Sequence, residues 1–379
     1  MEFLLSEEHE AVREMAKDFA TNELWPGAIE RDEIQQFPKS LVARMGQLGL
    51  MGIMTSSKYG GSEMDTISYV IALEEISKKD ASAGVIMSVN NSLVCWGLEK
   101  YGSEEQKQKY LTPLASGEKL GAFALSEPEA GSDATEQHTI AEDKGDYFLV
   151  NGIKNWITNG GSCDIVLVIV QSNQNLKHKG INVLIIEKGT DGFTVGPKEN
   201  KMGIRSSDTH QLIFSDVKVS KSNLILPEMN GFRFAMETLN GGRIGIAAQA
   251  LGIASGAYEL ALNYSKERKT FGKPINQHQA IQFKLSEMAT QIDAARLLCY
   301  KAAWLKDHGK DYSMASAQAK LFASKVAMDT TIEAVQIHGG YGYVKEFHVE
   351  RMMRDAKITQ IYEGTSEIQK MIISRELLK

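Results

Sequence analysis

The pattern of apolar and polar positions changes twice along the chain and divides it into three parts. Apolar residues recur at helical spacing after Ser6 until Pro26 ends the run. The same periodicity predicts further helices over residues 41–48, 69–79 and 83–100. We therefore expect residues 1–118 to form an N-terminal α-helical domain.

Residues 119–227 show a different pattern. Short runs rich in β-branched residues are separated by Gly, Asn and Asp, which predicts strands over residues 146–152, 164–170, 181–187 and 210–214. No helical stretches of the usual crossover length alternate with these runs. We therefore expect a middle domain built as an antiparallel β-barrel or sandwich rather than a parallel sheet.

Helical periodicity returns over residues 228–379 and predicts a C-terminal four-helix bundle around long helices at residues 231–266, 276–308 and 312–337. Gly245, Gly252 and Gly256 lie within the first of these helices. Each glycine costs about 1 kcal/mol relative to alanine there, so close approach of another helix is the expected reason for them. The fold class predicted is a multidomain α+β protein.

Composition and charge narrow the classes of function. A length of 379 residues suggests two or three domains, and 24% charged residues is typical of a globular protein. The net charge is −6 and no basic block is present, so nucleic acid is not an expected partner. No apolar run approaches the roughly 18 residues that a membrane span needs, so we expect no span.

The cysteines and histidines argue against a metal site. Cys95, Cys163 and Cys299 are far apart and odd in number, which favours a reducing compartment over a disulfide framework or a cysteine-based zinc site. The histidines show no ligand spacing, and His338 and His348 are expected to be structural or exposed. The acidic start resembles neither a secretory signal nor a transit peptide. We expect a cytoplasmic, bacterial location, or the mitochondrial matrix for a processed chain.

The stretch with the most distinctive chemistry is residues 361–369. Glu363 stands between Tyr362 and Gly364, and Thr365 begins a pair of helix-capping residues. Glu363 should therefore lie on a loop just before a helix, where a rigid scaffold can hold a base that reaches into a cavity. The alternative is an ordinary solvated carboxylate, since charged side chains are normally exposed.

Residues 362–369 resemble the catalytic-base segment of the acyl-CoA dehydrogenases, and the resemblance covers essentially the whole chain. It implies that Glu363 removes the α-proton of an acyl-CoA thioester while a hydride leaves the β-carbon for the flavin of FAD. It also implies that the Glu363 backbone N–H and a ribityl hydroxyl of FAD polarise the thioester carbonyl. The predicted α–β–α order matches the fold of that family.

Five further stretches carry the same resemblance, at residues 123–134, 155–160, 239–243, 268–275 and 336–346. It implies FAD contacts for Phe123, Leu125, Ser126, Ser132, Trp156, Ile157, Thr158, Arg268, Phe271, Gln279, Gln336, Gly339, Gly340, Thr365 and Glu367. It implies substrate contacts for Ser132, Asn240, Arg243 and Gly364. Arg268 is expected to reach the FAD pyrophosphate of a neighbouring subunit.

The residues taken alone leave alternatives at these stretches. A Trp in a β-rich domain is more often core than cofactor platform, although Trp156 and Thr158 should share one strand face at period two. Arg268 could simply end a helix favourably. One departure from the family pattern is Thr-Glu-Gln at residues 135–137, where a small residue is usual, which leaves the local loop shape open.

The resemblance also bears on the substrate. Residues 87–93 are similar to the short-chain (butyryl-CoA) members, in a helix that lines the acyl pocket, although plain helix packing would explain them too. Isovaleryl-CoA and long-chain members carry their catalytic Glu at a position that is Gly242 here, which leaves Glu363 as the candidate base. Butyryl-CoA is therefore the expected substrate.

An electron-transferring flavoprotein is the implied electron acceptor, and a homotetramer arranged as a dimer of dimers is the implied assembly. One alternative is an acyl-CoA oxidase that uses oxygen, although the chain lacks room for the extra C-terminal region of large oxidases. A second alternative is a non-catalytic helical CoA-binding or scaffold protein.

Overall fold

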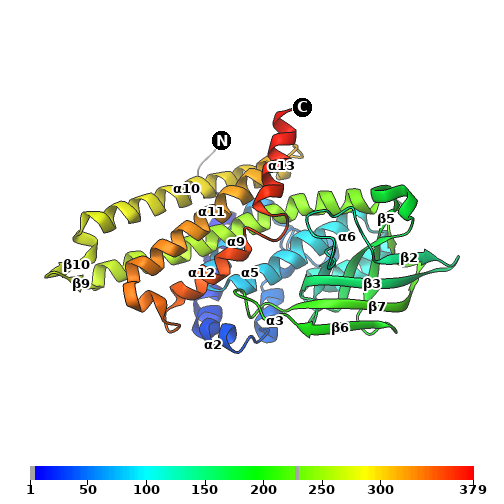
Figure 1. The fold of residues 1–379 in the computed structure, drawn as a ribbon, viewed down its shortest axis with the longest axis horizontal. Coiled ribbons are helices and arrows are strands. Elements are labelled where there is room, and N and C mark those ends of the chain that lie inside the picture. The colour runs from blue at the N-terminus through cyan, green and yellow to red at the C-terminus, as the bar shows by residue number, and fades with distance from the viewer. Residues whose placement is uncertain (1–4, 227–229) are drawn as a thin grey trace.

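The computed structural model describes residues 5–226 and 230–379, which form two helical parts and a sheet (Figure 1). The N-terminal helices are α1 (Glu7–Phe19), α2 (Ala28–Glu33), α3 (Lys39–Gln47), α4 (Thr66–Lys79), α5 (Ala81–Ser88), α6 (Trp96–Tyr101), α7 (Glu104–Gln106) and α8 (Thr112–Ala115). The π-helical segment Val89–Cys95 joins α5 to α6, so the predicted helix over residues 83–100 is continuous but wider in its middle. The predicted N-terminal helices are confirmed.

Short polar side chains begin these helices. The Ser6 hydroxyl accepts a hydrogen bond from the backbone N–H of His9 at 3.2 Å and starts α1. The Asp80 carboxylate accepts from the N–H groups of Ser82 and Ala83 at 3.0 and 3.2 Å and starts α5. Each cap satisfies N–H groups that the helix itself leaves without a partner.

The middle of the chain forms one eight-stranded sheet in the order β6-β7-β3-β2-β4-β5-β8, with β1 paired to β4. Its strands are β1 (Gly121–Ala124), β2 (Ile140–Asp143), β3 (Tyr147–Thr158), β4 (Ile165–Gln171), β5 (Ile181–Glu187), β6 (Phe193–Lys198), β7 (Thr209–Ser220) and β8 (Leu224–Ile225). The four predicted strands are present as β3, β4, β5 and β7.

The expectation of a purely antiparallel sheet is wrong at two pairings. Strand β1 runs parallel to β4, with Gly121 opposite Ile165, and β2 meets β4 in a single parallel pair. The short strands β1, β2, β6 and β8 were not predicted. Residues 121–124 carry no alternating pattern, and the segment is extended because the buried strand β4 supplies its partner.

The C-terminal part consists of α9 (Gly231–Glu267), α10 (Gln279–Asp307), α11 (Ser313–His338), α12 (His348–Ile358) and α13 (Ser366–Leu377), as expected from the long helical segments. Helix α9 packs against α4, α10 and α11 and also reaches β4 and β5. Figure 1 shows the sheet at one end of these helices and a small hairpin, β9 (Lys269–Thr270) with β10 (Lys273–Pro274), at the other. The domain boundaries remain a prediction, and the one at 227/228 lies outside the described residues.

Glycines of α9 let the helices α4 and α9 approach closely. A Cβ added at Gly252 would lie 2.5 Å from the carbonyl oxygen of Glu74, and one at Gly256 would lie 2.4 Å from that of Lys78. At Gly245 the same atom would lie 2.4 Å from the Tyr69 hydroxyl. The predicted reason for these glycines, a closely packed neighbouring helix, is confirmed.

Two helical stretches, Ala81–Tyr101 and Gly231–Glu267, are long and apolar enough to cross a membrane by length and mean hydropathy, contrary to our expectation. Their most apolar windows are 94% and 83% buried inside the protein. Core helices of globular proteins pass the same test, so length and composition alone are weak grounds for a span.

Replacing Gly252 with alanine should destabilise the protein by about 1–3 kcal/mol, because the added methyl group overlaps the backbone of α4. Gly241 on the same helix is the matched control, since its added Cβ would meet only the Ser92 carbonyl oxygen at 3.9 Å. Gly241→Ala should leave stability unchanged or raise it by up to about 1 kcal/mol. Thermal unfolding of both variants measures the difference, and equal midpoints would contradict the close packing.

Candidate active site

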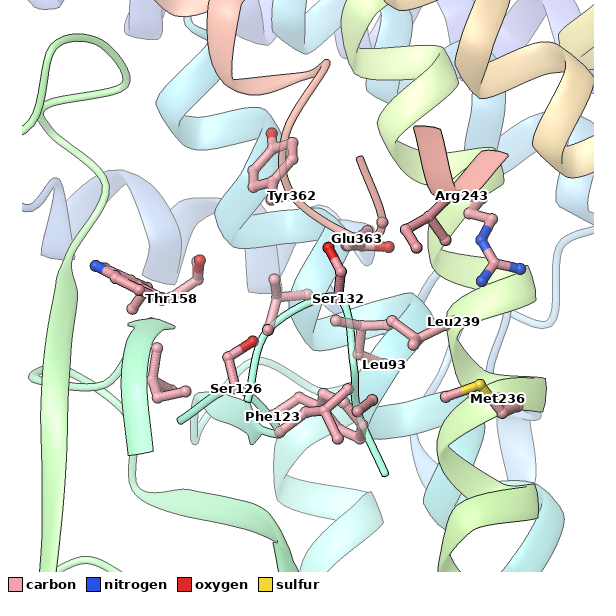
Figure 2. Close-up of a pocket in the computed structure, with 18 of the residues that line it drawn as sticks. Leu93, Phe123, Ser126, Ser132, Thr158, Met236, Leu239, Arg243, Tyr362 and Glu363 are labelled. Carbon is pink, nitrogen blue, oxygen red and sulfur yellow. The ribbon is translucent and has the colours of Figure 1, made fainter. Parts of the chain in front are cut away.

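A pocket opens where the sheet meets the helices (Figure 2). Its walls come from β1, β3, the loop after β1, the helical stretch from α5 to α6, helix α9 and the segment before α13. It gathers ten of the predicted site residues: Phe123, Leu125, Ser126, Ser132, Trp156, Ile157, Thr158, Arg243, Glu363 and Gly364. Segments more than 200 residues apart in the sequence thus supply one cavity.

Glu363 lies on the loop between α12 and α13, as predicted. Its backbone has a positive φ of 50°, and Gly364 follows at 93°. The Thr365 hydroxyl then caps α13 by accepting a hydrogen bond from the N–H of Ile368 at 3.4 Å. A non-glycine residue at positive φ is strained, so the surrounding contacts must hold this loop in place.

One oxygen of the Glu363 carboxylate is enclosed by protein, while the residue as a whole is half-buried and lines the pocket. Its Oε2 atom is buried and accepts no hydrogen bond from any residue in 5–226 or 230–379. A Cβ added at Gly242 of α9 would lie 1.9 Å from this oxygen, so the carboxylate occupies the space that a larger residue would fill. The alternative of an ordinary solvated carboxylate is therefore wrong.

Burial raises the pKa of Glu363 to about 7, although the charges of Lys320 and Arg243 oppose the rise. Arg243 is 4% exposed and donates a hydrogen bond to the Asn240 side chain; burial lowers its pKa to about 10. Asn240 is not a lining residue of the pocket and reaches it only through Arg243.

Lys320 is a residue that the sequence analysis missed. It lies on α11, its side chain is fully buried, and its Nζ donates a hydrogen bond to the carbonyl oxygen of Gly364 at 2.6 Å. Burial lowers the pKa of this ammonium group to about 7, against the opposing charge of Glu363. Its neighbours at helical spacing, Ser316, Ala323 and Ser324, are small but partly polar, so no clear sign in the sequence marks this lysine as buried.

A second buried lysine shapes the loop after β1. Lys154 Nζ lies 2.7 Å from Glu127 Oε1 and 2.6 Å from Gln137 Oε1, and it donates to the Leu125 carbonyl oxygen at 3.1 Å. Burial raises the pKa of Glu127, but Lys154 and backbone N–H groups lower it more, so the carboxylate stays ionised. Gln137, part of the departure from the family pattern, is thus a hydrogen-bond partner within this cluster.

Trp156 is 56% exposed, so the core alternative is wrong. The pairing of β3 with β7 shifts register between Lys154 and Ile157, and Trp156 takes a positive φ of 57°. A bulge of this kind turns a side chain away from regular alternation. The period-two argument that placed Trp156 and Thr158 on one strand face therefore fails locally, although both side chains line the pocket.

The helix expected to line the pocket contributes Val85, Val89 and Leu93, spaced four residues apart. The two asparagines of this stretch have a structural role instead. Asn90 donates to the Met51 and Leu114 carbonyl oxygens at 2.8 and 3.1 Å and accepts from the Gly121 N–H at 2.9 Å. The prediction that this helix lines the pocket holds for Val89 and Leu93, and the alternative of plain helix packing holds for Asn90.

Eight predicted cofactor residues are not lining residues of the pocket of Glu363: Arg268, Phe271, Gln279, Gln336, Gly339, Gly340, Thr365 and Glu367. Arg268, Gly339 and Gly340 instead line a separate hollow beside the β9–β10 hairpin. Phe271 is 96% exposed in the tight turn of that hairpin. Gln279 is the first residue of α10, and Gln336 lies in the last turn of α11. One chain therefore presents two separate clusters.

Thr365 and Glu367 line neither hollow, whereas His338 is a lining residue of the hollow beside the hairpin. Thr365 acts as a helix cap and Glu367 is exposed in the first turn of α13. His338 is buried and stacks on Tyr264 with ring centroids 4.2 Å apart, and His348 stacks on Trp25 at 3.5 Å. Within the described part of the chain, no group of three His, Cys, Asp or Glu side chains could hold a metal ion.

Comparisons with known proteins agree along the whole chain. Family models described as the acyl-CoA dehydrogenase N-terminal, middle and C-terminal domains match residues 6–118, 122–217 and 229–378. The chain is 51% identical over 379 residues to a short-chain specific acyl-CoA dehydrogenase of Clostridium acetobutylicum, with 100% of each covered.

Solved structures are similarly close. Butyryl-CoA dehydrogenase from Megasphaera elsdenii is 48% identical, with a TM-score of 0.99 and 100% of both chains covered. A chain in a structure described as the electron transferring flavoprotein of Acidaminococcus fermentans is 49% identical, with the same TM-score and coverage.

Proposed function

The chain belongs to the acyl-CoA dehydrogenase family, and from this premise we propose that it oxidises a short-chain acyl-CoA, with butyryl-CoA as the preferred substrate. The observation that carries the proposal is the Glu363 carboxylate, which lies in the pocket and has a pKa of about 7. One of its oxygens is buried and has no hydrogen-bond partner in the described part of the chain. A general base works best when its pKa lies near the operating pH.

Glu363 is proposed to take the α-proton of the thioester. Among the residues that the structure describes, none donates a hydrogen bond to Oε2 and so competes with that proton, while Arg243 and Lys320 favour the ionised form. The Glu363 backbone N–H is proposed to bind the thioester carbonyl and so make the α-proton easier to remove. The apolar side chains of Val89, Leu93 and Leu239 line the same cavity, so an acyl chain bound there would displace water from the base.

The pocket residues fit FAD as the proposed cofactor. An exposed indole, Trp156, stands beside the hydroxyl groups of Ser126 and Thr158, which suits a flat ring with polar edges. FAD, when bound, would supply the acceptor for the β-hydride. Phe123, Leu125, Ser132 and Ile157 complete the proposed contacts on the sheet side. Thr365 and Glu367 are proposed to meet the cofactor from the start of α13.

The second cluster is proposed to bind the pyrophosphate and adenosine part of FAD held by a neighbouring subunit. Arg268 and the backbone of Gly339 and Gly340 line a hollow away from the base of the same chain, and Phe271 extends into solvent next to it. An arginine side chain can bind a phosphate group through two parallel hydrogen bonds. Gln279 and Gln336 are proposed to assist there, within a homotetramer arranged as a dimer of dimers.

An electron-transferring flavoprotein is the proposed electron acceptor, supported by the 49% identity to a chain in the Acidaminococcus fermentans structure. We propose a cytoplasmic location, in keeping with the bacterial relatives. The oxidase alternative is tested directly by supplying oxygen in place of the flavoprotein during turnover.

Glu363→Gln should retain FAD and acyl-CoA binding and lose dehydrogenation by several orders of magnitude. The amide has the same shape as the carboxylate but cannot take a proton, and loss of a general base alone costs about 10²–10⁴-fold. Stopped-flow reduction of the bound flavin by butyryl-CoA measures the step. Glu14→Gln, at a carboxylate 62% exposed on α1, is the control and should match the parent. A Glu363→Gln variant with a tenth of the parental rate would exclude Glu363 as the base.

Arg268→Ala should weaken FAD retention and the oligomer together, because one side chain is proposed to join two subunits through the cofactor. Losing a charged hydrogen bond to pyrophosphate costs about 1.5–3 kcal/mol. Lys269→Ala, at the exposed neighbouring position, is the matched control. Flavin content after dialysis and the mass in sedimentation measure the two effects. FAD retention at the parental level would mean that Arg268 does not bind the cofactor.

The catalytic efficiency, kcat/KM, should be highest for butyryl-CoA and fall steeply towards octanoyl-CoA. Each methylene that a pocket accommodates contributes about 0.8 kcal/mol, and methylenes beyond its floor have no place to bind. Turnover of butyryl-, hexanoyl- and octanoyl-CoA with an electron-transferring flavoprotein measures this. A higher kcat/KM for octanoyl-CoA would contradict the short-chain substrate and leave the family assignment unaffected.

A further inference from the structure

We propose that Lys320 is a positioning residue for the base: its buried ammonium group binds the Gly364 carbonyl, fixes the loop that carries Glu363 and favours the ionised carboxylate. The inference rests on the proposed role of Glu363. It starts from an unusual placement, since Lys320 is among the largest fully buried side chains of the protein. Lysine is almost never buried completely unless a partner holds its charge.

The partner of Lys320 is the strained loop itself. Its Nζ donates to the Gly364 carbonyl oxygen at 2.6 Å, and the Gln369 Nε2 donates to the same oxygen at 2.8 Å and to the Glu363 carbonyl oxygen at 3.3 Å. Helices α11 and α13 therefore hold the loop from two sides. Backbone at positive φ, as found at Glu363 and Gly364, persists only where surrounding contacts determine it.

Charge adds to this geometric role. Lys320 and Arg243 are the two cations that lower the pKa of Glu363 against the effect of burial. Arg243 lies on α9 and Lys320 on α11, so the two approach the carboxylate from different helices. Removing Lys320 leaves one of the two positive charges, and the balance moves towards the protonated, inactive carboxyl group.

The other groups near this pair do not titrate in the range of interest. Burial raises the pKa values of Tyr69 and Tyr362 well above their ordinary range, so both remain neutral near pH 7. The pKa of Tyr312, near Arg243, is raised to about 12, and Arg375 also faces Arg243. Glu367, which faces Lys320 from α13, has a lowered pKa and stays ionised. Lys320 and Glu363 are therefore the two groups expected to change protonation between pH 5.5 and 9.

The test compares Lys320→Met, Lys320→Gln and Lys320→Arg with the parent, as holoenzymes of matched flavin content. Lys325→Met, at a side chain 69% exposed on the same helix, is the control. Steady-state kinetics with butyryl-CoA are measured from pH 5.5 to 9. The Met variant should lose about 10–100-fold in kcat, with KM changed little, because a small displacement of a reacting group has effects of that size. The Gln variant removes the charge but keeps a donor for the Gly364 carbonyl, so its kcat should fall less.

The pH profile separates this role from simple structural support. A cation lowers the pKa of a nearby carboxylate, so its loss should move the acidic limb of kcat/KM to higher pH, by about one unit. Lys320→Arg restores the charge and should return the limb to the parental pH, even where the larger side chain reduces kcat. An acidic limb at the parental pH in either neutral variant, or a kcat of Lys320→Met within twofold of the parent, overturns the inference.

The Gln variant guards against misfolding, since its amide can still donate to the Gly364 carbonyl if the Met variant does not fold. The parent serves as the check on the proposed function. A parent that oxidises no acyl-CoA contradicts the proposed function itself, whereas an active parent with unchanged Lys320 variants contradicts only the role of Lys320.

Discussion

A carboxylate oxygen held away from water, with no hydrogen-bond donor among residues 5–226 and 230–379, is the constraint that the rest of this structure serves. Such a group loses its hydration, and the loss disfavours its charged form. The protein accommodates Glu363 in two ways. Gly242 leaves space for its oxygen, and the cations Lys320 and Arg243 lower its pKa against the effect of burial. The loop that carries it has an unfavourable backbone conformation and is held by side chains from two helices.

Helix α9 links this site to the architecture. One face of α9 uses glycines to approach α4, and the same helix presents Gly242 and Arg243 to the carboxylate. Its first turns reach β4 and β5, so the sheet that bears Phe123 and Trp156 is placed against the helices that bear the base. The geometry of the pocket is therefore set by backbone-to-backbone distances, which side-chain motion changes little.

Local patterns and the family resemblance predicted different features. The long helices, four strands and the loop before α13 followed from periodicity and capping residues. The gathering of Phe123, Ser126 and Thr158 around Glu363 followed from the family resemblance. The pairing of β1 with β4 and the bulge at Trp156 depend on strands far away in the sequence, so no local pattern contained them. Lys320 and Lys154 were missed because a buried lysine becomes visible only when its distant partner is known.

The separation of Arg268 from Glu363 has a genetic consequence. In the proposed assembly each site takes its base from one chain and its pyrophosphate-binding arginine from another. Two inactive alleles, one altered in each cluster, would then assemble into mixed oligomers in which some sites carry both defects and others carry neither. Partial activity would return in a cell that carries both alleles, whereas two alleles altered in the same cluster would not complement each other.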